Sequence, residues 1–228
     1  MLFDLRGRGR RRTVQVIYLS LAILMGGGLV LFGIGGGTNG GLFDAIGGSG
    51  GSSTSVDAVF KKRLDTYEKR LKANPQDQAA LIGMTKLYFG SASTGENFNQ
   101  TQNAYTAKGL GQLRLASASW ERYLATKPAK PDPGTANLMV QVYGPAGLKQ
   151  YDKAVTSMEA VIASRKETAN LYAQLAILAA GAKQDRKSTL AENKALDLTP
   201  KAQRKELKSA IDLQKSQLNV EQPTQPSG

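Results

Sequence analysis

The first 43 residues combine a cluster of arginines with a long run that contains no Asp, Glu, Lys or Arg. Five arginines lie within residues 6–12, and the next charged residue is Asp44. Inside this run, residues 14–34 form a predominantly apolar stretch of 21 residues. At a helical rise of about 1.5 Å per residue it reaches about 30 Å, the thickness of a bilayer's hydrocarbon core. Because a backbone in lipid must satisfy its own hydrogen bonds, we predict a single transmembrane helix at 14–34.

The charges on either side of this stretch predict its orientation. The basic segment 1–13 precedes it, whereas residues 35–55 carry only Asp44. The positive-inside bias then places the N-terminus in the cytoplasm and the C-terminal domain outside, as in a bacterial inner (plasma) membrane protein. The alternative is a cleaved secretory signal, whose apolar region is usually about 7–15 residues long. Whether the helix is retained as a signal-anchor or cleaved stays open.

Residues 35–55 have the composition of a flexible linker. Nine of these 21 residues are glycine, and serines and a threonine follow them. Treated as a flexible coil, the segment spans about 25 Å root-mean-square. We therefore expect a Gly/Ser-rich linker, a helical domain at 56–218 and a disordered tail at 219–228.

The chain contains no cysteine and no histidine. This composition excludes disulfides, thiolate and imidazole catalysis, and the usual zinc sites. The carboxylates that remain have the spacing of solvated helix faces; Asp152 and Glu159, for example, lie seven residues apart on a predicted helix. We expect no catalytic residue, no metal site and no cofactor.

From Val56 onward the apolar residues recur at helical spacing. The first stripe ends at Asn74-Pro75, and two later helices end at Lys127-Pro128 and Thr199-Pro200. A helix that ends in proline, repeated along a chain, is a reason to look for internal repeats. Three first helices share a spacing of three and four, with stripes Leu81/Met84/Tyr88, Ala136/Met139/Tyr143 and Tyr172/Leu175/Ala179. Three second helices follow them, with stripes Ala116/Trp120/Tyr123, Ala154/Met158/Val161 and Ser188/Glu192/Ala195.

This pattern resembles the tetratricopeptide repeat (TPR), a 34-residue helix–turn–helix unit. The resemblance is clearest in ASASWERYLATKP (116–128) and YDKAVTSMEAV (151–161), and it covers residues 75–210. It implies an all-α, TPR-like solenoid of antiparallel helix pairs. In such repeats Trp120 and the tyrosines of the stripes are packing residues.

The sequence also departs from the repeat pattern. Residues 90–108 form a polar insertion in the first repeat, and Gly144–Gly147 adds two residues to the second. The third repeat has Glu192 where a bulky apolar residue is expected, so that face is predicted to be open. A final helix at 201–218 is expected to cap the last repeat, and residues 56–72 the first one. The inward residues predicted for the final helix are Leu207, Ala210, Ile211, Leu213 and Leu218.

The TPR resemblance implies a binding surface. In these solenoids the first helix of each pair lines a concave groove that holds a peptide or a partner helix. Amide side chains in such a groove can pair with the backbone of an extended peptide. The groove-facing candidates are Ile82, Lys86, Asn137, Gln141, Asn170 and Gln174.

A basic surplus offers an alternative mode of attachment. From Val56 onward there are 25 Lys and Arg against 16 Asp and Glu. Such a surplus favours anionic lipid or an acidic envelope polymer. The candidate contact residues lie on the final helix: Lys201, Arg204, Lys205 and Lys208. We expect no nucleic-acid partner, because the predicted topology places the domain outside the cell; reversed topology with nucleic-acid binding is the third alternative.

Together these features predict a single-pass membrane scaffold or adaptor that binds a protein or peptide partner. In architecture alone, the arrangement is similar to that of the single-span ancillary subunit of the bacterial Sec translocon, which implies a link to secretion or envelope assembly. The anchor would act as a tether that raises the effective concentration of the groove near membrane-bound partners.

Overall fold

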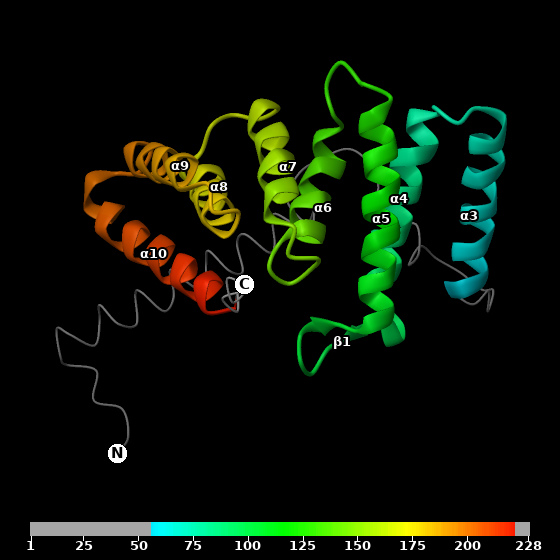
Figure 1. Ribbon diagram of the computed structural model, residues 1–228, viewed down its shortest axis with the longest axis horizontal. Helices are drawn as coiled ribbons and strands as arrows, with labels where there is room; N and C mark the ends of the chain where they lie inside the picture. The colour runs from blue at the N-terminus through cyan, green and yellow to red at the C-terminus, as the bar shows by residue number, and fades with distance from the viewer. Residues whose placement is uncertain (1–55, 222–228) are drawn as a thin grey trace, which may run out of the picture. The chain divides into compact units, whose positions relative to one another are not determined.

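The computed structural model describes residues 56–221, which are almost entirely α-helical (Figure 1). The α-helices are Val56–Ala73 (α3), Gln78–Ala92 (α4), Ala107–Ala125 (α5), Pro133–Tyr143 (α6), Tyr151–Ala163 (α7), Ala169–Gly181 (α8), Asp185–Asp197 (α9) and Arg204–Glu221 (α10). Shorter elements are the 3₁₀-helices Gly95–Asn97 (η1) and Lys201–Gln203 (η2), and the strands Phe98–Asn99 (β1) and Ala104–Tyr105 (β2). The all-α prediction is confirmed for this part of the chain.

The chain divides after Arg165 into two compact units, and the described residues contribute 56–165 to one and 166–221 to the other. In the first unit, α4 packs against α5 and α6 packs against α7, while α3 covers α4. In the second, α8 packs against α9, and α10 packs on both. The 56–165 unit therefore contains two pairs of consecutive helices after α3, and the 166–221 unit contains one such pair followed by α10.

No helix within residues 56–221 is both long enough and apolar enough to cross a membrane. The predicted transmembrane helix at 14–34 lies outside the described residues, together with the basic segment 1–13 and the linker 35–55. At the other end, α10 continues to Glu221, which corrects the expected start of the disordered tail at residue 219.

The buried side chains follow the predicted stripes in the first two helix pairs. In the first pair they are Leu81, Met84, Tyr88, Ala116, Trp120 and Tyr123, and in the second Ala136, Met139, Tyr143, Ala154, Met158 and Val161. Trp120 is only 2% exposed, which confirms its packing role. The stripes combine large and small side chains, and their burial removes apolar surface from water.

The second unit follows the pattern with two exceptions. Leu175, Ala179, Ser188 and Ala195 are buried, and the Ser188 hydroxyl donates a 2.8 Å hydrogen bond to the Ala176 carbonyl across the helix pair. Tyr172 is half-buried and donates through its hydroxyl to Glu167. In α10, Ile211 and Leu218 are buried as predicted, but the prediction for Leu213 is wrong: its side chain is 54% exposed.

The polar insertion of the first repeat is a small ordered structure, shorter than the predicted 90–108. The α4 helix continues to Ala92, β1 and β2 form a hairpin, and α5 already begins at Ala107. The Phe98 and Tyr105 rings meet edge to face across the hairpin, with centroids 5.2 Å apart. Gly109 allows the carbonyl of Asn97 to lie against α5, because a Cβ at this position would collide with that oxygen.

Candidate partner-binding surface

The helix α4, the first helix of the first helix pair, begins at a capped N-terminus. The Asp77 carboxylate accepts a 3.0 Å hydrogen bond from the Ala80 amide. It also accepts hydrogen bonds from Nε and Nη2 of Arg70, a residue in the last turn of α3. These contacts, the Ala80 amide foremost, hold the pKa of Asp77 below its ordinary value. The cap fixes where α4 starts and thus which of its residues face outward.

Ile82 and Lys86 lie one turn apart on α4, and both are half-buried. The Lys86 ammonium is 3.6 Å from Oδ1 of Asp132, the residue that caps the N-terminus of α6 through the Thr135 amide (2.8 Å) and hydroxyl. Burial acts to raise the pKa of Asp132, but the Thr135 hydrogen bonds and the Lys86 charge lower it by more. Lys86 is thus tied to the start of α6 instead of projecting as a free cation.

Asn137 and Gln141 lie one turn apart on α6 and are half-buried as well. Since α4 packs against α6, the structure brings four of the six predicted groove residues onto two neighbouring helices. Within residues 56–221 the side-chain amide of Asn137 has no hydrogen-bond partner. Asn137 therefore has donors and an acceptor to offer to a ligand, on the helix that packs beside the one carrying Ile82.

Asn170 and Gln174 belong to the other unit, on α8. The Gln174 amide donates a 3.0 Å hydrogen bond to the Asn170 side-chain oxygen. One amide group of each residue is thus used within the helix, although an amide retains further donor and acceptor capacity. The predicted groove set is split: four residues lie in the 56–165 unit and two in the 166–221 unit.

A polar cluster that the sequence did not reveal joins three helices of the first unit. Glu121 of α5 accepts from Lys153 of α7 (2.6 Å), from Ser117 (3.0 Å) and from the Tyr143 hydroxyl of α6 (3.4 Å). The pKa of Glu121 lies below its ordinary value, and the hydrogen bond from Lys153 is the largest cause. Burial, with the Glu121 charge nearby, raises the pKa of Tyr143 to about 12. These groups satisfy one another, so the cluster links the two helix pairs.

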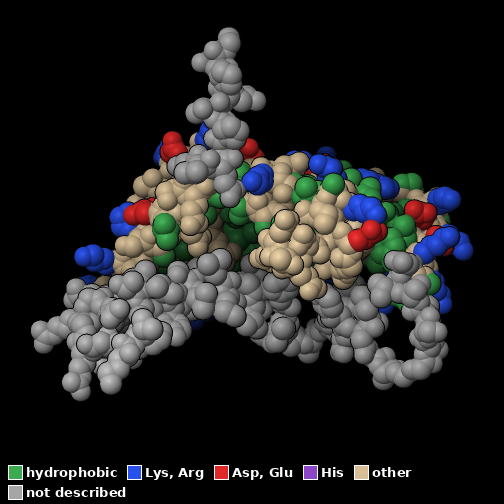
Figure 2. All heavy atoms as spheres, turned by 90° about the horizontal axis from the view of Figure 1, so that it is seen from below, with side chains coloured by type: hydrophobic (Ala, Val, Ile, Leu, Met, Phe, Trp, Pro, Cys, Tyr) green, Lys and Arg blue, Asp and Glu red, His purple; other side chains and the backbone are tan. Residues whose placement is uncertain are grey.

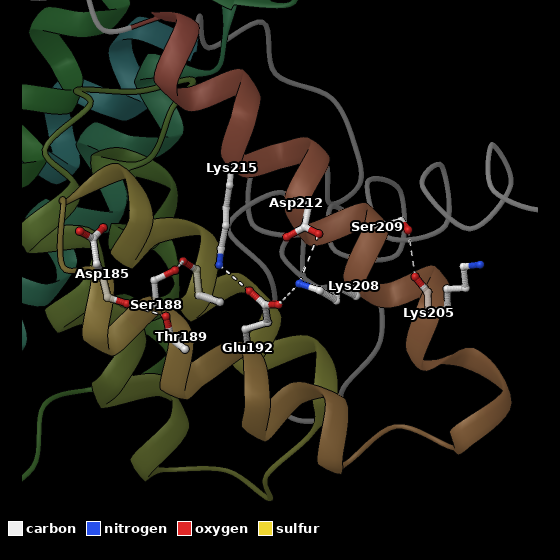
Figure 3. A network of polar contacts seen from close by, with 10 residues as sticks. Asp185, Ser188, Thr189, Glu192, Lys205, Lys208, Ser209, Asp212 and Lys215 are labelled. Carbon is white, nitrogen blue, oxygen red and sulfur yellow. Dashed lines mark hydrogen bonds and ion pairs between the residues drawn. The ribbon is translucent and has the colours of Figure 1, made fainter.

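In the second unit, Glu192 of α9 is held between two lysines of α10 (Figure 3). Lys208 Nζ lies 2.7 Å from one carboxylate oxygen and Lys215 Nζ 2.7 Å from the other. Lys208 also lies 3.4 Å from Asp212. Burial acts to raise the pKa of Glu192, but the two lysines lower it by more. The face predicted to be open is therefore covered by α10, with an ionic contact in the place of an apolar one.

This arrangement changes the account of the basic residues on the final helix. Lys208 is engaged with Glu192 and Asp212, and Arg204 donates to the Thr199 carbonyl (3.0 Å) and the Asp197 carbonyl (3.4 Å) at the end of α9. Lys201 and Lys205 are exposed. Two of the four candidate residues for an anionic surface thus serve the internal structure of the unit, and two face the solvent.

No group of three or more Asp, Glu, His or Cys side chains within residues 56–221 is arranged to hold a metal ion. Comparison with protein-family models, with curated proteins and with solved structures found no match. What this chain does must therefore be argued from its own residues.

Proposed function

We propose that this chain is a single-pass, membrane-anchored scaffold that presents a TPR-like helical domain at the outer face of a bacterial plasma membrane and binds a protein or peptide partner. The support for the anchor is the charge-free apolar stretch at 14–34 and the arginines before it. The support for a repeat-like binding domain is the packing of consecutive helix pairs with buried stripes at the repeat spacing.

The observation that carries the proposed binding is the pair of neighbouring first helices, α4 and α6. They offer Ile82 on one helix and, on the other, the Asn137 amide, which has no partner among the described residues. An extended segment lying across them would gain apolar contact at the first position and a backbone hydrogen bond at the second, as in other modes of peptide recognition. Gln141, one turn further along α6, extends this surface.

A photo-crosslinking residue placed at Gln141 in membranes of the native cell tests this proposal. We expect one partner to be captured from position 141, and to be lost when Asn137→Ala is added. Thr156, exposed on the second helix α7, provides the matched control site, which should not capture the same partner. Equal capture from both sites, or capture that Asn137→Ala leaves unchanged, would contradict the proposal.

The dependence of capture on salt concentration distinguishes partner binding from the electrostatic alternative. A contact made by apolar area and neutral amides should persist at about 0.5 M salt, where exposed charges more than a few ångströms apart are screened. Capture that disappears with salt would favour attachment to an anionic lipid or envelope polymer instead.

A further inference from the structure

The outward side of α3 carries four exposed lysines: Lys61, Lys62, Lys69 and Lys72. Lys62 and Lys69 are seven residues apart, and Lys69 and Lys72 are three apart, so they lie on one side of the helix. The other side faces α4 with Phe60, Tyr67 and Leu71; the Phe60 ring lies 6.1 Å from that of Tyr88. We call the four lysines the α3 lysine face.

The charges of this face are not used within the described part of the chain. Among the side chains that the structure describes, those of residues 58–218, none forms an ion pair with any of the four lysines. Asp65 lies among them, and the exposed Glu68 lies four residues before Lys72, so the α3 lysine face keeps a surplus of two positive charges. The Glu68 charge also contributes, after burial, to the raised pKa of Tyr88 on α4. Figure 2 shows Lys and Arg side chains projecting at the end of the 56–165 unit where α3 lies.

This distribution differs from the one expected from the sequence, which placed the anionic contact on the final helix alone. On α10, Lys208 and Arg204 are engaged with groups of their own unit. A lysine that already neutralises a carboxylate has less to gain from an anionic surface than a lysine with no partner. The free positive charge therefore favours α3 over α10 as the site of an electrostatic contact.

The position of α3 in the chain indicates which surface it meets. The helix begins at Val56, directly after the 21-residue segment 35–55 and the predicted membrane span 14–34. If it is the linker that its glycine and serine content predicts, it spans about 25 Å root-mean-square, and α3 would stay within reach of the headgroups. Anionic headgroups attract lysines close to the membrane surface.

We propose that α3 lies on the anionic lipid headgroups of the membrane that holds the anchor, with Lys61, Lys62, Lys69 and Lys72 as the contact residues. This inference rests on the proposed membrane anchor and adds the element through which the domain meets the lipid. The contact would orient the repeats of the 56–165 unit relative to the bilayer.

The absence of cysteine makes a sharp test available, because a single introduced cysteine can carry a nitroxide spin label. Thr66→Cys on α3 and Ser209→Cys on α10 form a matched pair of sites. Both residues are exposed, and each hydroxyl donates to the carbonyl four residues earlier, at 2.8 Å and 3.0 Å. The labelled full chain is reconstituted into vesicles of phosphatidylcholine alone or with about one third phosphatidylglycerol. Power-saturation EPR then measures collisions with a nickel chelate attached to the lipid headgroups.

We expect collisions at position 66 to rise several-fold when phosphatidylglycerol is present, and collisions at position 209 to change little. Lys62→Gln with Lys69→Gln should lower the equilibrium constant for contact about 25-fold, or about fivefold per lysine at about 1 kcal/mol each. Lys201→Gln with Lys205→Gln removes the same charge from exposed positions and should leave collisions at position 66 unchanged.

Three results would overturn the proposal: equal collisions at position 66 in the two kinds of vesicle, a rise at 209 instead of 66, or equal effects of the two double variants. Carbonate extraction of the same vesicles distinguishes failure of the α3 contact from failure of the membrane anchor. Protein retained in the vesicles without a lipid-dependent signal at position 66 contradicts the α3 contact alone. Protein released by carbonate contradicts the anchor, and the present proposal with it.

Discussion

Glu192 of α9 and Lys215 of α10 form a 2.7 Å ion pair in which the two side chains are only 12% and 19% exposed. The carboxylate occupies the position where the repeat pattern calls for a bulky apolar residue, and Lys208 pairs with its other oxygen. The final helix is therefore attached to the last helix pair by a charge contact as well as by Ile211 and Leu218.

Replacing Glu192 by glutamine should destabilise the 166–221 unit. The change leaves two lysines facing a neutral amide, one of them largely shielded from water. Hydrogen bonds to charged groups contribute about 1.5–3 kcal/mol, so we expect a loss of about 2 kcal/mol in the free energy of unfolding. Urea denaturation followed by circular dichroism measures it. Lys205→Gln, at an exposed position of α10, is the control and should change stability by less than about 0.5 kcal/mol.

The same carboxylate should make stability depend on acid pH. The pKa of Glu192 is lower in the folded chain than its ordinary value of about 4.3. Its contribution is therefore complete above that ordinary value and is lost as the pH falls through the lower folded value. We expect the difference in unfolding free energy between wild type and Glu192→Gln to be constant from pH 7 to about pH 5 and to shrink below about pH 4. A difference that stays constant down to pH 3 would contradict the ionic contact.

Tyr143→Phe should change the response to alkaline pH. The folded Tyr143 has a pKa of about 12, whereas an unfolded tyrosine titrates near about 10. Its folded state keeps the proton that the unfolded state loses, so wild-type stability should decline as the pH rises from about 10 toward about 12. The phenylalanine variant should show a smaller decline and, near neutral pH, a loss of about 1 kcal/mol for the hydrogen bonds with Ser117 and Glu121. Tyr105→Phe, on the hairpin, is a suitable comparison.

Gly83→Ala should loosen the packing of α3 on α4. A Cβ at position 83 would lie 2.6 Å from Cε1 and 2.7 Å from the hydroxyl oxygen of Tyr67, so the ring must move. Overpacking of this kind costs about 1–3 kcal/mol. Gly111 on α5 provides the control, because a Cβ there meets nothing within 4 Å. Gly111→Ala should stabilise the chain by up to about 1 kcal/mol through helix propensity. Thermal unfolding that ranks the two variants in the opposite order would contradict this packing.

Much of the fold was predictable because the buried stripes are periodic. Leu81, Met84 and Tyr88 repeat a spacing that a helix requires, and the prolines at 128 and 200 mark where helices end. The hairpin was less accessible. Phe98 and Tyr105, whose rings meet across it, stand alone in a polar stretch with no strand or helix period, and the close approach of the Asn97 carbonyl to Gly109 has no periodic signal. Leu213 was misassigned because helical spacing places it close to the inward face, while α8 and α9 cover only part of α10.

The candidate site was predictable only in part. Helix spacing located Ile82, Lys86, Asn137 and Gln141 on first helices, but it could not show that Asp132 would engage Lys86 from the loop before α6. In the same way, the lysines of α10 looked alike in sequence. Tertiary packing decides which of them finds a carboxylate: Lys208 reaches Glu192, sixteen residues away, and Lys205 stays in solvent. One local signal was available and unused, the spacing of four between Ser117 and Glu121.

Asp77 serves two helices with one carboxylate, since it holds the first turn of α4 through the Ala80 amide and grips Arg70 at the end of α3. With Tyr67 seated on Gly83 a few residues away, the two helices are coupled at their junction and along their length. A force applied to α3 would therefore act on α4, the helix that carries Ile82. Mechanical load from whatever precedes Val56 would be passed directly to the helices at which a partner is proposed to dock.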